Sequence, residues 1–241
     1  MQEPNGEVVC RLQHVDKVYE GAVPTPALLD INLQVQRGEF LVVLGASGSG
    51  KTTLLNIIGL LDTPTSGQVW VAGSNAAQLD EEQRAGLRSR YMGFVFQFHY
   101  LLPEFTVLEN ALLPCKIAGK GVEQQNRERV QDLLVRVGLG DRLNYRPSQI
   151  SGGQQQRVAI VRALANNPEL VLADEPTGNL DSKNGFAVFE MMRFMNRQTG
   201  TAFVVVTHDE RLAQKADRVV VLEDGRIIRD EVQRPAQTHE L

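Results

Sequence analysis

The sequence predicts an α/β fold, because short apolar runs typical of buried strands alternate with helix-like stretches in two parts of the chain. The first part holds the apolar run Phe40–Leu44, a glycine-rich turn and a helix-like stretch over residues 53–58. The second part extends over residues 170–221, and the pattern between the two, from 104 to 165, is helical. We therefore expect a core of strands and helices with a helical region inserted into it.

The N-terminal segment is predicted to add strands to this core. Residues 8–35 look like two or three strands, which flank Gly21 and the proline-rich stretch 23–26. A turn is predicted at residues 63–67, where proline and glycine interrupt the pattern, and a further strand at 68–71.

The glycine-rich turn is a complete G-x-x-x-x-G-K-[ST] sequence, made of Gly45, Ala46, Ser47, Gly48, Ser49, Gly50, Lys51 and Thr52. A strand that delivers such a turn lets backbone N–H groups converge on phosphates, and the helix that begins near Thr53 adds the positive end of its dipole. Lys51 would reach the β- and γ-phosphates, and the Thr52 hydroxyl would bind Mg²⁺. The chain is therefore predicted to bind a nucleoside triphosphate, with the N-terminal strands beside it.

Two further patterns concern the helical region and the end of the chain. Apolar residues recur at i, i+3, i+4 and i+7 from Val130 to Val137 and predict an amphipathic helix that ends at Gly138. The chain after Glu231 is polar, and we expect a mobile tail there.

A second anion-binding element is predicted inside the helical region. Ser151, Gly152, Gly153 and Gln154 precede an apolar helical pattern that starts at Val158, so they form a helix N-terminus. The N-terminus of a helix binds anions. Alone, this segment would indicate only a capped helix. Its place between the glycine-rich turn and the acidic strand described next favours a phosphate-binding role.

Another apolar run ends in two adjacent acids, Asp174 and Glu175. Asp174 is placed at a strand end to hold Mg²⁺ through its water shell, whereas Glu175 points elsewhere and can polarise an attacking water. An acid beside the metal-binding acid favours hydrolysis of the triphosphate. The sequence contains no Asn-Lys-x-Asp motif for guanine recognition, which disfavours a GTPase.

These motifs, with Gln97, Asp181 and His208 in the expected order around them, resemble the ATP-binding-cassette (ABC) ATPase family over essentially the whole chain. The resemblance implies an α/β fold with a P-loop NTPase ABC ATPase core, an N-terminal antiparallel β subdomain and an inserted helical subdomain. Within a single domain over 1–241, the core and β subdomain would occupy about 8–97 and 166–230. The helical subdomain would occupy 98–165, and the tail 231–241.

The resemblance also implies roles for individual residues. Tyr19 would stack on adenine, and we favour this role over that of an ordinary strand aromatic. Gln97 would meet Mg²⁺ and the attacking water, and His208 would hydrogen-bond the γ-phosphate from a strand end. Glu175 would be the catalytic base, and Asp181 would cross toward a partner subunit.

A head-to-tail homodimer follows from the same resemblance. In the family, the Ser-Gly-Gly helix lies on a subdomain far from the P-loop of its own chain. Each ATP, with its Mg²⁺, would therefore lie between Lys51 of one copy and residues 151–154 of the other. The signature of this chain begins with Ile150 where leucine is usual. We expect this mild change to leave the phosphate contacts intact.

The loop after Gln97 is rich in aromatic and leucine side chains, and a loop this apolar has to be covered. The helical subdomain can cover it, and we favour this interpretation for Leu101 and Leu108. Four further side chains are expected to form a groove that accepts a short helix from an integral membrane subunit. They are Phe98, His99, Tyr100 and Phe105.

Residues 97–110 and 172–181 are similar to those of the lipoprotein-releasing (LolD-type) branch of the family and of the related MacB-type exporters. This likeness implies ATP-driven release or export of lipoproteins from the inner membrane, with the chain held at the cytoplasmic face by membrane subunits. Export of another cargo and force transmission in cell division remain alternatives. A nucleic-acid-associated ATPase is disfavoured, because no long heptad segment separates Thr52 from Ser151.

Composition agrees with a subunit that does not insert into the membrane itself. With 241 residues, 42% of them hydrophobic, the chain can bury one large core. No apolar run approaches the ~20 residues of a membrane span, and residues 1–4 show no signal peptide. The net charge of −4 argues against nucleic acid as a partner. Cys10 and Cys115 have no metal-binding spacing and are expected to be free thiols in a reducing cytoplasm.

Overall fold

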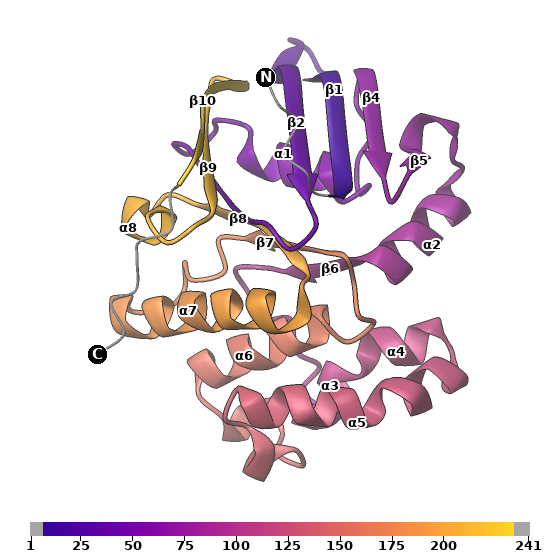
Figure 1. Cartoon of the computed structure of the whole chain (residues 1–241), viewed down its shortest axis with the longest axis vertical. Helices are drawn as coiled ribbons and strands as arrows, with labels where there is room; N and C mark the ends of the chain where they lie inside the picture. Colours follow the sequence, from indigo (N-terminus) through magenta and orange to yellow (C-terminus); the bar gives the residue numbers. More distant parts are fainter. Residues whose placement is uncertain (1–6, 234–241) are drawn as a thin grey trace.

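The computed structural model describes residues 7–233, and its centre is a six-stranded sheet (Figure 1). The strand order is β10-β9-β3-β8-β7-β6, and all neighbours are parallel except β9 and β10. The α/β fold that the sequence predicts is confirmed. The strands are β3 (Phe40–Leu44), β6 (Met92–Val95), β7 (Leu170–Asp174), β8 (Ala202–Thr207), β9 (Arg218–Glu223) and β10 (Arg226–Val232).

A second sheet is antiparallel and lies against one face of the first, with helix α1 (Lys51–Ile58) packed between them (Figure 1). Buried residues of α1, β1 and β2 share one hydrophobic cluster with Leu41 and Val43 of β3. The predicted N-terminal antiparallel sheet is therefore present. In the order β2-β1-β4-β5, its strands are β1 (Val8–Tyr19), β2 (Thr25–Gln36), β4 (Ser66–Val71) and β5 (Ser74–Asn75).

Helices cover the opposite face of the large sheet (Figure 1). Their buried side chains form a second cluster with Phe40, Val42 and Leu44 of β3. Successive residues of a strand face opposite sides, and both sides are covered here, so all five residues of β3 are buried. These helices are α3 (Val107–Ala111), α4 (Leu113–Ala118), α5 (Lys120–Arg136), α6 (Gly152–Ala163) and α7 (Ser182–Thr199).

Helices α3 to α6 all lie between β6 and β7 in the sequence, where the helical region was predicted. The predicted amphipathic helix is α5, which buries Val130 and Leu134. The helix ends at Arg136, two residues before the expected end at Gly138, and Val137 is buried just beyond it. The exact division of the chain into core and subdomains remains a prediction.

Shorter elements complete the described part of the chain. In residues 7–233, no helix is both long and apolar enough to cross a membrane. Strand β10 continues two residues into the predicted tail, whose residues 234–241 lie outside the described part. Cys10 and Cys115 are buried and unpaired, and burial raises the pKa of Cys10 to about 12. The remaining elements are α2 (Glu81–Tyr91), α8 (Glu210–Ala213), η1 (Ala76–Gln78), η2 (Gly140–Arg142) and η3 (Pro147–Gln149).

Candidate active site

The predicted catalytic residues gather where the parallel strands of the large sheet end. Strand β7 ends at Asp174, β8 ends just before His208, and β6 ends two residues before Gln97. Open α/β sheets bind their ligands at this edge. A cavity of about 510 Å³ lies there. Its lining consists of Thr25, Pro26, Ala27, Ser47, Gly48, Gly50, Lys51, Thr52, Thr53, Gln97, Asp174, Glu175, Gly178 and His208.

Two glycines of the loop occupy positions where no side chain fits. A Cβ atom on Gly45 would lie 2.4 Å from the carbonyl oxygen of Leu222, and one on Gly50 would lie 2.4 Å from that of Ala27. Gly50 also has a φ of 104°, in the left-handed region that favours glycine, and it is the N-cap of α1. The loop therefore enters the helix at once, and the first residues of α1 line the cavity.

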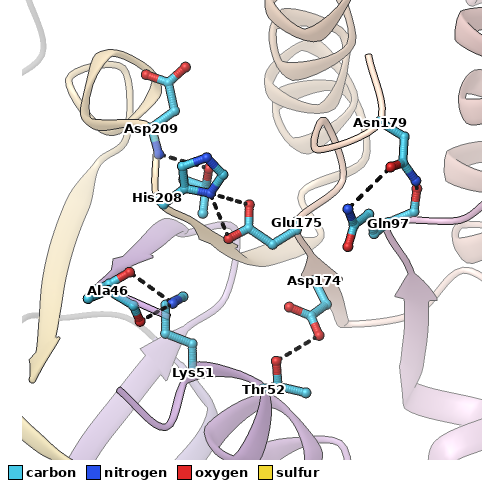
Figure 2. A network of polar contacts seen from close by, with 11 residues as sticks. Ala46, Lys51, Thr52, Gln97, Asp174, Glu175, Asn179, His208 and Asp209 are labelled. Atoms are coloured by element: carbon cyan, nitrogen blue, oxygen red, sulfur yellow. Dashed lines mark hydrogen bonds and ion pairs between the residues drawn. The ribbon is translucent and has the colours of Figure 1, made fainter. Parts of the chain in front are cut away.

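Lys51 is held by its own loop (Figure 2). Its Nζ donates to the carbonyl oxygens of Gly45, at 2.8 Å, and Ala46, at 2.7 Å. An ammonium group has three donors, so one is left for a phosphate oxygen. The Lys51 side chain is thus fixed over the loop before any nucleotide arrives. Its predicted contact with the β- and γ-phosphates stays a prediction.

The residues predicted to bind Mg²⁺ come together. The Thr52 hydroxyl donates to Oδ2 of Asp174 at 3.0 Å, and Gln97 lines the same cavity. Burial raises the pKa of Asp174, and the charge of Glu175 raises it further, while the bond from Thr52 opposes both. In the described residues, no group of three or more His, Cys, Asp or Glu side chains is placed to hold a metal. One carboxylate with hydroxyl and amide oxygens fits Mg²⁺, which takes most of its ligands from phosphates and water.

Glu175 and His208 form a pair at the mouth of the cavity (Figure 2). Nδ1 of His208 lies 3.1 Å from both carboxylate oxygens of Glu175, so it carries the hydrogen and donates. Glu175 has a φ of 44°, which is costly for a residue other than glycine, and its N–H donates to the carbonyl of Val206 at 3.0 Å. This backbone turn separates the Glu175 carboxylate from that of Asp174, so the two acids serve different partners.

Tyr19 lies beside the cavity without lining it. Its strand partner across the β1–β2 pair is Thr25, which does line the cavity. The Tyr19 hydroxyl donates to Asp62 at 3.1 Å, and the ammonium of Lys17 lies 4.8 Å from the ring centroid. Its predicted contact with adenine remains untested.

The second predicted phosphate-binding segment is formed but lies outside the cavity. Ser151 is the N-cap of α6: its hydroxyl accepts from the N–H of Gln154 at 3.3 Å, and its own N–H donates to the Gln154 side chain at 2.8 Å. Gly152 and Gly153 follow in the first turn. None of the four residues lines the cavity of this chain. Asp181 likewise caps another helix, α7, and lines a separate hollow with His208.

An apolar groove of about 550 Å³ lies beside the loop that follows β6. Phe96, Tyr100 and Ile117 line it, with 37%, 65% and 75% of each residue exposed. Tyr100 is the only one of the four predicted docking residues in this lining. Phe98 is exposed next to Tyr100, His99 turns inward to Gln156 at 2.6 Å, and Phe105 is half-buried near Lys116.

Some lining residues are not predicted as site residues by the sequence. Thr25 and Pro26 belong to a stretch that was expected beside the nucleotide, but neither was named as a site residue. Ala27 and Gly178 carried no signal of their own. Gly178 stands next to the Asn179 that contacts Gln97, and its role could have been inferred only from that contact.

Comparisons with known proteins agree with this geometry. The sequence model of the family described as "ABC transporter" matches residues 28–178, more than half of the chain. The lipoprotein-releasing system ATP-binding protein LolD of Shewanella denitrificans is 51% identical over 233 residues, which is 96% of this chain and 100% of that protein. The protein of the same name from Anaeromyxobacter dehalogenans is 53% identical over 231 residues, 95% of this chain and 97% of its own.

Solved structures extend the match to three dimensions. A dimeric structure of a bacterial ABC transporter cassette is 42% identical, with a TM-score of 0.83, and covers 94% of this chain and 100% of its own. A dimeric post-hydrolysis state of an ATP-binding cassette bound to ADP and Pi is 40% identical, with a TM-score of 0.80 and the same coverage. The chain therefore belongs to the ABC transporter family, as an ATP-binding cassette that uses Mg²⁺ and hydrolyses ATP.

Proposed function

We propose that the chain is the ATP-hydrolysing subunit of a transporter that releases lipoproteins from the inner membrane, where it works at the cytoplasmic face. The names of the relatives that are about half identical over nearly the whole chain support this proposal. The observation that carries it is the pairing of a cavity that gathers the predicted hydrolytic side chains with an exposed apolar groove one loop away. The cavity would bind ATP, and the groove would transmit the resulting movement to a membrane subunit.

Hydrolysis is proposed to occur between two copies of the chain. The Ser151 end of α6 is exposed and lies outside the cavity of its own chain, so a phosphate in that cavity would meet it only from another copy. Related cassettes have been solved as dimers. In this arrangement, Lys51 of one copy and residues 151–154 of the other hold the same triphosphate, and Asp181 lies near the contact between copies.

The energy available at these contacts is sufficient to drive closure. Moving a dimer from about 1:99 to 99:1 needs about 5.5 kcal/mol of differential binding. A charge-assisted hydrogen bond contributes about 1.5–3 kcal/mol, so a few such bonds at each γ-phosphate supply this energy. Loss of the γ-phosphate removes these bonds, and the two copies separate.

The chemistry within the cavity follows from the side chains around it. Mg²⁺, held through Thr52, Asp174 and Gln97, would neutralise charge on the phosphates. Glu175 would accept a proton from the attacking water, and the hydrogen bond from His208 would keep its carboxylate oriented. His208 also lines the cavity, where it can contact the γ-phosphate.

The groove is proposed to receive a short helix of a membrane subunit. Its exposed aromatic and aliphatic side chains suit the apolar face of a helix, and Phe96 and Tyr100 belong to the loop that carries Gln97. A shift of that loop on ATP binding would therefore move the bound helix directly. Phe98, which is exposed beside Tyr100, would extend this contact surface, whereas the half-buried His99 and Phe105 would support the loop.

Ile117→Asp tests this proposal, because it places a charge in the groove on a side chain that is 75% exposed and outside the cavity. We expect basal ATP hydrolysis of the isolated subunit to be unchanged. Copurification with coexpressed membrane subunits and lipoprotein release from reconstituted vesicles should both be lost. Val135→Asp is the matched control, because Val135 is also exposed in the helical region but lies outside the groove. Normal assembly and release by Ile117→Asp would contradict the groove as the docking site.

The reconstituted complex also separates the alternatives. ATP-dependent release of a lipoprotein into solution is expected of the proposed transporter. Transport of a different cargo would indicate a MacB-type exporter, and stimulation of ATP hydrolysis without any cargo movement would indicate a cell-division ATPase.

A further inference from the structure

Asn179 contacts both the backbone and the side chain of Gln97. Its Nδ2 donates to the Gln97 carbonyl oxygen at 3.0 Å, and its Oδ1 accepts from Gln97 Nε2 at 3.2 Å. The two residues are 82 positions apart in the sequence and follow β6 and β7, which are neighbours in the sheet. Figure 2 shows the two side-chain amides facing one another.

The direction of these bonds is dictated by chemistry. A backbone carbonyl can only accept, so the nitrogen of Asn179 must face the Gln97 carbonyl. The oxygen of Asn179 then faces the Gln97 side chain, which has to present its nitrogen there. The Gln97 oxygen is consequently left on the side of Asp174, as Figure 2 shows. An oxygen, and not an amide nitrogen, is what Mg²⁺ binds.

The neighbouring glycine makes room for this arrangement. A Cβ on Gly178 would lie 3.0 Å from Nε2 of Gln97 and 3.3 Å from its side-chain carbonyl carbon. A side chain at this position would crowd the Gln97 amide. Gly178 and Asn179 together therefore fix where that amide lies and which way it is turned.

We propose that Asn179 is a positioning residue that turns the side-chain oxygen of Gln97 toward the metal. The proposal deepens the proposed function, because it rests on Gln97 as a ligand of Mg²⁺. It also links the metal site to the segment that continues to Asp181. Movement of that segment against a second copy of the chain would be felt at the metal through a pair of hydrogen bonds.

The test measures the gain in nucleotide affinity that Mg²⁺ provides. The full-length chain is titrated with a non-hydrolysable ATP analogue by calorimetry, once with Mg²⁺ and once with a chelator. Loss of a group that orients a metal ligand typically costs about tenfold in metal affinity. We expect Asn179→Ala and the isosteric Asn179→Asp to reduce the Mg²⁺-dependent gain about tenfold, with affinity in chelator unchanged. Asn126→Ala, which removes an amide bonded within α5, should leave the gain intact.

A double variant distinguishes positioning from a structural effect. If Asn179 acts through Gln97, then Asn179→Ala should cause no further loss in a Gln97→Ala background. A full additional loss there, or wild-type behaviour of both Asn179 variants, would overturn the inference. The same assay tests the proposed nucleotide site separately. If Lys51→Ala bound the analogue as tightly as the wild type, the nucleotide site itself would be wrong, and this result differs from either outcome that overturns the inference about Asn179.

Discussion

The two segments of this chain that we propose to bind phosphate are built alike and placed differently. Both are glycine-containing turns at the start of a helix, with Gly50 capping α1 and Ser151 capping α6. The first is enclosed by Asp174, Glu175 and other cavity residues, whereas the second faces solvent and has only its own capping bonds. The glycine loop lies in a cavity together with the predicted catalytic side chains of the same chain. The Ser151 segment lies outside that cavity.

The difference indicates which part of the proposed nucleotide site a single chain can form. The first segment can bind nucleotide in a single copy, because its loop, lysine and metal-binding oxygens are brought together by one sheet. In the proposed dimer, the second would contribute only across the interface between copies. Variants of the first segment should therefore affect binding or chemistry, and variants of the second should affect association of the two copies.

Glu175→Gln is expected to have the largest effect. Removal of the proton acceptor should lower the turnover of ATP about a thousandfold, because general bases contribute about 10²–10⁴. Nucleotide binding should persist, and an ATP-bound dimer should accumulate, as size-exclusion chromatography would show. Glu128→Gln, on the exposed side of α5, serves as the control. Turnover at the wild-type rate would exclude Glu175 as the base.

Lys51→Ala should weaken binding itself. Loss of a charge-assisted hydrogen bond worth up to about 3 kcal/mol predicts an affinity for ATP that is about 100-fold lower. Fluorescence titration with a labelled nucleotide measures this affinity in the single chain. Lys120→Ala, at the exposed start of α5, should bind normally. Equal affinities for the two variants would remove the lysine from the phosphate site.

Ser151→Ala tests the second segment, and its effect should be smaller and of a different kind. Binding of ATP to the single chain should be unchanged. ATP-driven dimerisation of a Glu175→Gln background should weaken about tenfold for each of the two shared sites, because each site loses one hydrogen bond of about 1.5 kcal/mol. Thr106→Ala removes the same kind of helix cap from α3 and controls for lost capping. If both variants dimerise equally well, Ser151 does not contact the shared phosphate.

The smallest predicted effect is a change in how thermal stability depends on pH in acid, caused by Asp217→Asn. Asp217 accepts from the N–H of Phe40, at the start of the strand that leads to the first segment, and pairs with Arg193. Burial by itself would raise the pKa of Asp217, but these bonds lower it below its usual value. Asp217 thus stabilises the fold above its unfolded pKa of about 4, and this contribution is lost as pH falls toward the lower folded pKa. Thermal melts of Asp217→Asn should therefore depend less on pH below about 4 than those of the wild type.

The sequence was most informative where local chemistry and packing agree. The glycine loop, the buried strands β3 and β7, and the cap at Ser151 all follow from residues that are close in the chain. These are the positions at which steric limits, burial or capping leave few alternatives. The α/β fold and the antiparallel sheet were predicted for the same reason, with the family resemblance fixing their arrangement.

Features that depend on contacts between distant segments could not be predicted. Helix α2 buries none of its residues, so it shows no apolar period, and only the cap at Asp80 marks its start. His99 was expected at the docking surface, but its side chain turns inward. Its Nδ1 lies 2.6 Å from Oε1 of Gln156, which is buried in α6 and accepts a hydrogen bond from it. The pairing of Gln97 with Asn179 joins two loops, and no local pattern encodes it.

Crosslinking tests most directly whether the site is shared between copies. Cys10 and Cys115 are buried, so they should not react with a short thiol crosslinker. Chains that carry Ser47→Cys and chains that carry Ser148→Cys, both with Glu175→Gln, are mixed with ATP and Mg²⁺. Both positions are exposed, one in the glycine loop and one just before the Ser151 cap. We predict an ATP-dependent product with the mass of two chains. If the mixture gives none, and one chain carrying both cysteines is crosslinked within itself at the mass of a single chain, the shared site is contradicted.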